Sequence, residues 1–410
     1  MLVAAVIVGS AESLSPLTQF GGLSLVKRAV LTAQKSGAHT CYLYVAGDTH
    51  AMRRELQEDA RVTSRLVWNE APEEQASAHD TSSDLWLLCP VDTIFRHPVV
   101  QQLLQNPPPG HPLVVRASGT EPLLALLPAR DGLQLCREFA EGKLLRETSV
   151  VADPEAHWVP PPPGQFVRRL QRATDVPALE HDLLCSLENV RDGVVDKHLN
   201  RKLSRPVTRW LLRTPITPNQ ITLLAGAMSL VGACCFLPGG YLGPVLGALF
   251  LQWSAVLDCC DGEVARIKFM ESPLGDALDI VCDTVGALAI FLGIGVAVSK
   301  NGASEHALLL GGVLALGGLL AFPLVTLAEK TEAEGIQRGG WEDILIQKVL
   351  INLTNRDYSL LILLSAVVGQ LGWFLWGAAI GSHVFWMVLA WLLARAGRFA
   401  LVRDAWGRKR

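Results

Sequence analysis

LDCCDGEVAR at residues 257–266 decides the fold of the carboxyl-terminal half, together with GDALDIVCD at residues 275–283. Asp258 and Asp261 are three residues apart, and Asp279 and Asp283 are four apart, so on helices each pair lies on one face. Both stretches adjoin long apolar runs. A carboxylate within a membrane span costs about 2.5–3.5 kcal/mol on insertion scales, so these aspartates are candidates for function.

The residues between the two stretches predict that a second helix begins there. Ser272 is a typical N-cap, and Pro273 suits the first helical position. Two helices that meet here would bring four carboxylates to one point. An all-oxygen site of this kind favours Mg²⁺ or Mn²⁺ over zinc, and two such ions can stabilise a phosphoryl centre under attack. One carboxylate would also accept the proton of the attacking hydroxyl.

Other residues in the two stretches are interpreted without a role as metal ligands. Gly262 and Ala265 are small enough for a nucleotide to approach the backbone, and Arg266 can hold a phosphate in its planar guanidinium group. Periodicity does not exclude Asp276 as a ligand, but we interpret it as a first-turn carboxylate that the helix dipole favours. We interpret Glu263 as a solvated residue at the membrane interface.

Apolar runs predict a membrane domain, since a spanning helix needs about 20 apolar residues. The candidate spans are 221–238, 241–258, 277–298 and 305–328, followed by an apolar stretch from Tyr358 to Leu393. That stretch is too long for one ordinary span, so we predict two shorter ones. The turn would lie near Gly369-Gln370-Leu371-Gly372 or near Gly381-Ser382-His383, and hydropathy leaves both open. Six spans place both termini on one side.

Basic residues orient these spans. They precede the first span, separate the fourth from the fifth and follow the last, at Lys197, Arg201, Lys202, Arg205, Arg209, Arg213, Lys330, Arg338, Lys348, Arg356, Arg395, Arg398, Arg403, Arg408, Lys409 and Arg410. The opposite loops offer only Lys300. Because cytoplasmic loops are enriched in Lys and Arg, we expect an inner-membrane protein with both termini in the cytoplasm.

The basic segment 192–213 has apolar residues at helical spacing. It predicts a helix that lies in the cytoplasmic interface, where its cations meet anionic headgroups. A solvated charged linker is the alternative. A second amphipathic piece, Ile344–Leu353, is expected to lie in the long cytoplasmic loop.

Length and composition allow two domains in the 410 residues. The net charge of −3 does not favour nucleic-acid binding. Nine cysteines without a CxxC pair argue against a disulfide framework or a zinc site. The apolar run Leu2–Val8 has no basic residues before it, so we do not expect a secretory signal peptide.

The complete pattern, DxxDGxxAR followed after eight residues by GxxxDxxxD, resembles the CDP-alcohol phosphatidyltransferase family at every fixed position. The resemblance covers about residues 195–410. It implies transfer of a phosphoalcohol group from a CDP-alcohol to a second alcohol, with release of CMP. It also implies that Asp258, Asp261 and Asp279 bind two divalent ions. Asp283 would be the general base, with a share in the second metal.

The same resemblance implies where the nucleotide binds. The run Thr217-Pro218-Asn219-Gln220-Ile221-Thr222 is similar to the family's segment at the start of the first span. The implied CDP-binding residues are Thr217, Pro218, Asn219, Gly262, Ala265, Arg266, Ser272 and Gly275. Neither acceptor nor donor alcohol is identified, and the acceptor could be a lipid or a polyol phosphate such as inositol phosphate. Gly311-Gly312 and Gly317-Gly318 would allow a homodimer, or close packing within the monomer.

The amino-terminal half alternates short apolar runs with amphipathic segments. Strands are predicted at Leu2–Val8, Cys41–Ala46, Ser64–Trp68, Leu85–Cys89, Leu113–Arg116 and Leu123–Leu127, and helices at Leu23–Ser36, Pro98–Leu104 and Leu133–Ala140. This order predicts an α/β, Rossmann-like domain with a mostly parallel sheet. Gly21-Gly22 and the run Pro90–Phe95 resemble the sugar-nucleotidyltransferase fold, in which an aspartate at the position of Asp92 binds a metal.

The phosphate-binding loop departs from that family. Residues Gly9–Thr18 lack its basic residue and its Pro-Lys pair, and Glu12 would repel a triphosphate. We therefore expect a degenerate nucleotidyltransferase-like domain. In the alternative, it makes the CDP-alcohol from CTP, as in the archaeal fusion of inositol-1-phosphate cytidylyltransferase with di-myo-inositol-phosphate phosphate synthase, whose layout this chain resembles.

The predicted architecture is therefore multidomain. Residues 1–165 form a nucleotidyltransferase-like domain, 166–215 a linker with the interfacial helix, and 216–410 an all-α transmembrane domain of six helices. A membrane scaffold or transporter is the competing class of function. The aspartate pattern counts against it, because a scaffold needs no two-metal site.

Overall fold

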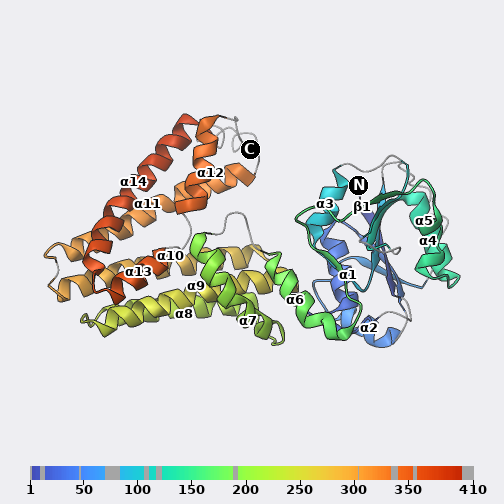
Figure 1. Cartoon of the computed structure of the whole chain (residues 1–410), viewed down its shortest axis with the longest axis horizontal. Helices are drawn as coiled ribbons and strands as arrows, with labels where there is room; N and C mark the ends of the chain where they lie inside the picture. The colour runs from blue at the N-terminus through green and yellow to red at the C-terminus, as the bar shows by residue number, and fades with distance from the viewer. Residues whose placement is uncertain are drawn as a thin grey trace. The chain divides into compact units, whose positions relative to one another are not determined.

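The computed structural model describes residues 2–9, 14–45, 48–69, 84–105, 110–116, 122–187, 193–302, 304–333, 340–353 and 358–398. The chain divides into two compact units, Met1–Leu187 and Glu188–Arg410. Figure 1 shows the first unit as a sheet with helices on both faces, and the second as a bundle of long helices. Residues 166–187 belong to the first unit, whereas the sequence-based division ends its domain at residue 165; the three-part division by function stays a prediction.

The sheet of the first unit contains seven strands in the described residues, in the order β10-β8-β9-β6-β1-β4-β5. The strands are β1 (Leu2–Gly9), β4 (Thr40–Val45), β5 (Arg65–Trp68), β6 (Leu85–Pro90), β8 (Leu113–Val115), β9 (Leu124–Pro128) and β10 (His157–Val159). β1 pairs in parallel with both β4 and β6, and β9 runs antiparallel to β6 and β8. The predicted α/β domain with a mostly parallel sheet is confirmed.

Two further pairs of short strands complete this unit: β2 (Gln19–Phe20) with β3 (Leu23–Ser24), and β7 (Thr93–Phe95) with β11 (Val167–Arg169). The helices are α1 (Leu25–Lys35), α2 (Thr49–Gln57), α3 (His97–Leu104), α4 (Ala129–Ala140), α5 (Ser149–Ala152) and α6 (Val176–Cys185). Three of them, α1, α3 and α4, were predicted and begin and end within four residues of the predicted bounds, whereas α2, α5 and α6 were not predicted.

Helices on both faces explain why β1 is apolar at nearly every position. Ala4, Val6 and Val8 belong to one buried cluster together with Leu135 and Phe139 of α4. The alternate residues of β1 point to the other face, where α1 packs. Figure 1 shows α1 and α4 on opposite sides of the sheet.

The second unit is helical in the residues described. Its elements are a π-helical turn (Asp196–Asn200), α7 (Arg201–Leu212), α8 (Pro218–Phe236), α9 (Leu242–Lys268), α10 (Pro273–Lys300), α11 (Ala307–Ala333), α12 (Trp341–Leu353), α13 (Tyr358–Val367) and α14 (Leu371–Arg395). Five of these, α8 to α11 and α14, are long and apolar enough to cross a membrane. The chain is therefore an integral membrane protein.

The apolar stretch from residue 358 onwards forms two helices, as predicted. α13 ends at Val367, and α14 begins at Leu371. Gly369 between them has a φ of 74°, a conformation that favours glycine. Gly381, the alternative turn, lies inside α14. Because α13 has only 10 residues, the six-span count stays a prediction.

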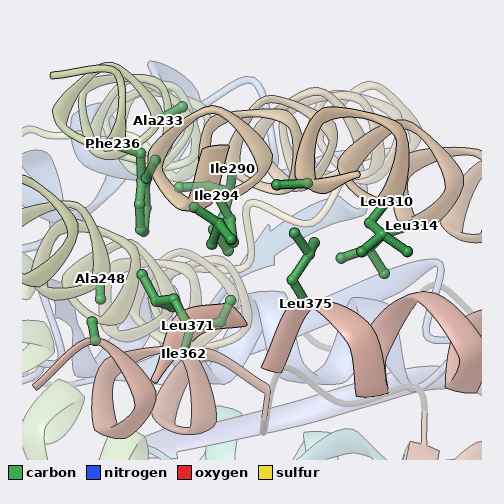
Figure 2. Close-up of a cluster of buried hydrophobic side chains, with 14 of the residues drawn as sticks. Ala233, Phe236, Ala248, Ile290, Ile294, Leu310, Leu314, Ile362, Leu371 and Leu375 are labelled. Atoms are coloured by element: carbon green, nitrogen blue, oxygen red, sulfur yellow. The ribbon is translucent and has the colours of Figure 1, made fainter. Parts of the chain in front are cut away.

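Figure 2 shows the apolar core that holds the long helices together. Phe236 of α8, Ile290 and Ile294 of α10, Leu310 of α11 and Leu375 of α14 meet there and are buried. Glycines allow the helices to approach closely. A Cβ on Gly247 of α9 would lie 2.6 Å from the ring of Phe236, so a larger residue would separate α8 from α9.

Three of the four glycines considered for a dimer interface, Gly311, Gly317 and Gly318, have neighbours within the chain. A Cβ on Gly311 would lie 3.1 Å from Cα of Gly295, and a Cβ on Gly317 would lie 2.3 Å from Oγ of Ser382. Both therefore serve helix packing inside the unit. Gly312 has open space beside it, and homodimerisation stays a prediction.

Candidate metal centre

The turn between α9 and α10 brings the two aspartate-containing stretches together. α9 ends at Lys268, and its C-cap residue Phe269 is in the left-handed conformation and donates its backbone N–H to Ala265 O. α10 begins after Ser272, whose Oγ accepts from the N–H of Gly275 at 3.1 Å, with Pro273 as its first residue. The predicted helix start is therefore confirmed, and a four-residue connection joins the two helices.

Three of the four predicted ligands converge. Asp258 and Asp261 of α9 and Asp279 of α10 each offer a carboxylate oxygen, and these oxygens all lie within 4.8 Å of one another. Asp261 is buried, and the other two are half-buried. An all-oxygen donor set of this kind fits a divalent cation such as Mg²⁺ or Mn²⁺. Asp283 and Asp276, on the same helix as Asp279, fall outside this group of three.

Asp261 is held in place by α8. Thr222 Oγ1 donates a hydrogen bond to Asp261 Oδ2 and lies 3.1 Å from the carbonyl oxygen of Pro218. A hydroxyl that orients a ligand oxygen is a typical outer partner of a metal site. Sequence reasoning did not assign this role to Thr222, although its place in the TPNQIT run was the available signal.

Part of the predicted CDP-binding set also lies together. A Cβ on Gly275 would lie 3.1 Å from Asn219 Oδ1 and 3.2 Å from Ser272 Oγ, so the start of α8 adjoins the start of α10. Thr217 is the N-cap of α8, with Pro218 as the first helical residue. This arrangement brings polar atoms from two helix N-termini to one place.

Gly262, Ala265 and Arg266 lie on the last turns of α9. Arg266 Nε donates to Gly262 O at 2.8 Å, and a Cβ on Gly262 would lie 3.0 Å from Arg266 Nη2. The guanidinium group therefore lies along the helix surface beside Gly262. Glycine at this position leaves room for it.

Glu263 corrects a sequence-based interpretation. We expected a solvated interfacial residue, but its side chain is completely buried. It forms an ion pair with Arg201 Nη1 at 2.9 Å and accepts hydrogen bonds from Ser204 and Thr208. All three partners lie on α7, which covers this face of α9.

The segment before the first span is the predicted helix, with its regular part at α7. Leu211 and Leu212 are buried, whereas Leu203 and Trp210 are exposed. A solvated linker is excluded, because Lys268 of α9 donates to the carbonyl oxygens of Leu211 and Thr214. Placement of α7 in the membrane interface stays a prediction.

In the first unit, Asp92 has an arginine partner. Its Oδ2 lies 2.8 Å from Arg169 Nε, and the carboxylate is buried. Leu170 N–H donates to the carbonyl oxygen of Asp92 at 2.7 Å, which ties the strand β11 to this position. Nearby, burial raises the pKa of the Cys89 thiol, so this side chain stays protonated. Glu12 lies outside the described residues.

Comparison with known proteins gives a family match in the membrane unit and several partial relatives. Residues 215–378 match the family model described as CDP-alcohol phosphatidyltransferase. A bifunctional IPC transferase and DIPP synthase from Rubrobacter xylanophilus is 37% identical over 129 residues, which are 32% of this chain and 28% of the relative.

Two further relatives give similar figures. The Aquifex aeolicus bifunctional IPC transferase and DIPP synthase is 36% identical over 98 residues, covering 24% of this chain and 22% of the relative. A phosphatidylinositol phosphate synthase from Mycolicibacterium smegmatis is 37% identical over 93 residues, covering 23% and 41%. The chain thus spans less than half the length of each of these relatives.

Proposed function

Residues 215–378 match the model of the CDP-alcohol phosphatidyltransferase family, and from this premise we propose that the chain is a membrane enzyme that transfers a phosphoalcohol group. The donor is a CDP-alcohol, the acceptor is a second alcohol, and CMP is released. The observation that carries the proposal is the group formed by Asp258, Asp261 and Asp279. A scaffold has no need of three carboxylates held this close together.

Asp258, Asp261 and Asp279 would hold divalent cations, with Asp283 as a further ligand of a second ion. When bound, two such ions offset the negative charge of the diphosphate and of the leaving CMP. Thr222 fixes the carboxylate of Asp261 through its hydrogen bond. The chain thereby supplies preorganised charge, so little reorganisation is needed during the reaction.

The residues around the carboxylates would hold the donor. Gly262 and Ala265 have small side chains, so the donor can approach the backbone of α9 closely. Arg266 pairs with a phosphate of the donor. Thr217, Pro218, Asn219, Ser272 and Gly275 supply polar groups from the starts of α8 and α10. Asp283 accepts the proton of the acceptor hydroxyl. The acceptor oxygen then forms its bond to phosphorus as the bond from phosphorus to the CMP oxygen breaks.

We propose a phosphorylated polyol as the acceptor class to test first, with a lipid alcohol as the alternative. The support is the names of the relatives, one of which is a phosphatidylinositol phosphate synthase. CMP release by the purified protein, measured across CDP-alcohols paired with polyol phosphates or lipid alcohols, tests the proposal. We expect release only with Mg²⁺ or Mn²⁺. CMP from no pair under either metal would favour the scaffold or transporter.

The first unit is proposed to be a degenerate nucleotidyltransferase-like domain. Arg169 neutralises the carboxylate of Asp92 at the position where the fold binds a metal, and this supports the degenerate interpretation. The bifunctional names of two relatives favour the alternative, in which this unit makes the CDP-alcohol from CTP.

The full chain, incubated with CTP and sugar or polyol phosphates, is expected to release no pyrophosphate above background. The reason is that the loop lacks cations for the triphosphate and Asp92 is already paired. Pyrophosphate measured by a coupled assay checks this expectation. Release that Asp92→Ala abolishes would establish the bifunctional alternative.

We also propose six spans with both termini in the cytoplasm, because the basic residues gather on one side. Cysteines placed at Glu305 and at Gln347 test this, in a variant whose accessible native thiols are removed. In sealed right-side-out cells, an impermeant thiol reagent should label Glu305→Cys and leave Gln347→Cys unlabelled. Labelling at both positions would contradict the six-span arrangement.

A further inference from the structure

A line of buried polar contacts joins α7 to α9. Glu263 is 0% exposed, and its two carboxylate oxygens receive Arg201, Ser204 and Thr208. These three residues are spaced by three and four positions, so they lie on one face of α7. Arg201 is itself only 6% exposed. The ion pair is therefore enclosed by protein rather than by water.

Other contacts extend this line along α9. Before α7, Asn200 accepts from Gln252 Nε2, and Ser359 Oγ donates to Gln252 Oε1 at 3.0 Å. Towards the other end, Lys268 Nζ donates to Thr214 O at 2.8 Å and to Leu211 O at 3.3 Å. The contacts thus span residues 252–268 of α9, a segment that includes Asp258 and Asp261.

Glu263 and the metal carboxylates point in different directions from α9. A helix advances about 100° per residue, so Glu263 lies about 200° from Asp261 around the axis. Contacts at Glu263 therefore fix the rotation of α9 from the side opposite the metal centre. A buried carboxylate needs both its cation and its hydrogen bonds, so few other orientations of α9 satisfy it.

We propose that Glu263 and Arg201 are a positioning pair, which sets the rotation of α9 so that Asp258 and Asp261 face Asp279. The inference rests on the proposed function, since it concerns the same metal centre. Neither residue touches the substrates. Loss of the pair lets α9 rotate, and the three carboxylate oxygens then separate.

The test measures Mn²⁺ affinity by electron paramagnetic resonance in purified wild type, Glu263→Gln, Arg201→Met and Arg201→Lys. Mutation of an outer partner of a metal site typically costs about 10–100-fold in affinity or activity. We expect a loss of Mn²⁺ affinity in this range for Glu263→Gln and Arg201→Met. Their kcat should fall by a larger factor than the factor by which their KM for the CDP-alcohol changes. Arg201→Lys keeps the cation and should stay within about threefold of wild type.

Asp343→Asn is the matched control. Asp343 of α12 forms another buried ion pair, with Arg398 Nη2 at 2.6 Å, so its loss should lower the melting temperature comparably. The Mn²⁺ affinity of the Asp343→Asn variant is expected to equal that of wild type. If Glu263→Gln behaves like Asp343→Asn, with a lower melting temperature and wild-type Mn²⁺ affinity, the positioning role is wrong.

A double variant covers the case in which the single variants do not fold. Arg201→Met with Glu263→Gln leaves no uncompensated buried charge, so its stability should recover. Its Mn²⁺ affinity should stay reduced, because the rotation of α9 is no longer fixed. Recovery of both properties would make the pair merely structural. Absence of Mn²⁺ binding in wild type would instead overturn the proposed function.

Discussion

Asp258→Asn and Asp279→Asn are each expected to reduce CMP release by at least about 10²–10³-fold, the loss typical of removing one preorganised electrostatic contact. The reduction should be larger if no ion binds, because the three carboxylates, whose oxygens lie within 4.8 Å of one another, are proposed to hold the same ion. Steady-state CMP release with saturating donor and Mg²⁺ measures the effect. Mn²⁺ affinity, measured in parallel, reports loss of the ion, and the melting temperature of each variant reports misfolding.

Asp276→Asn is the control for these variants. Asp276 lies in the first turn of α10, three residues before Asp279, but does not belong to the group of three. Its neutralisation should change CMP release by less than about fivefold, since first-turn charges contribute only about 0.3–1 kcal/mol through the helix dipole. Turnover within tenfold of wild type in either ligand variant would remove the metal-site assignment.

Local features of the sequence were sufficient for most helices and strands. The apolar periodicity of β1 and α1, and the Ser272-Pro273 start of α10, depend on neighbours along the chain and were predicted within a few residues. The turn at Gly369 was one of two open positions, and the left-handed backbone there fits only one of them.

Contacts between distant residues were not predictable in the same way. Glu263 was expected to be solvated, because a carboxylate beside a basic helix end usually faces water. Its partner Arg201 is 62 residues away, and the sequence gives no sign that α7 covers this face of α9. Arg169, the partner of Asp92, is 77 residues away from it in the sequence, and this pair was not predicted either. Periodicity identifies the face of a helix but not the element that packs against it.

One part of the candidate site was predictable from neighbouring residues, and another part depends on contacts between distant residues. The spacing of Asp258 and Asp261 predicted one shared face, and that of Asp279 and Asp283 predicted another. The short connection between α9 and α10 brings Asp279 to Asp258 and Asp261. Thr222 and Asp261 meet only because α8 packs beside α9. The position of Asp283 relative to the other three was the least predictable, because one turn along α10 changes the distance to every group on α9.

Asp283→Asn and Arg266→Ala should fail in different ways, although both residues are proposed to act at one centre. Asp283 is proposed to accept the proton of the acceptor, so Asp283→Asn should lower kcat by about 10²–10⁴-fold, and further if it also holds a metal. The KM for the CDP-alcohol should change little. Steady-state kinetics with donor and acceptor varied separately, supported by the pH dependence of kcat, measures this.

Arg266→Ala should instead raise the KM for the CDP-alcohol, because its guanidinium group is proposed to hold the donor phosphates in ground and transition states alike. Loss of hydrogen bonds to a charged group costs about 1.5–3 kcal/mol, or roughly 10–150-fold in kcat/KM. Arg266→Lys keeps the charge without the planar fork and should recover part of the loss. If Asp283→Asn kept a normal kcat and only weakened donor binding, the base would have to be another residue. Asp276, about two turns nearer the start of α10, would then be tested by the same kinetics.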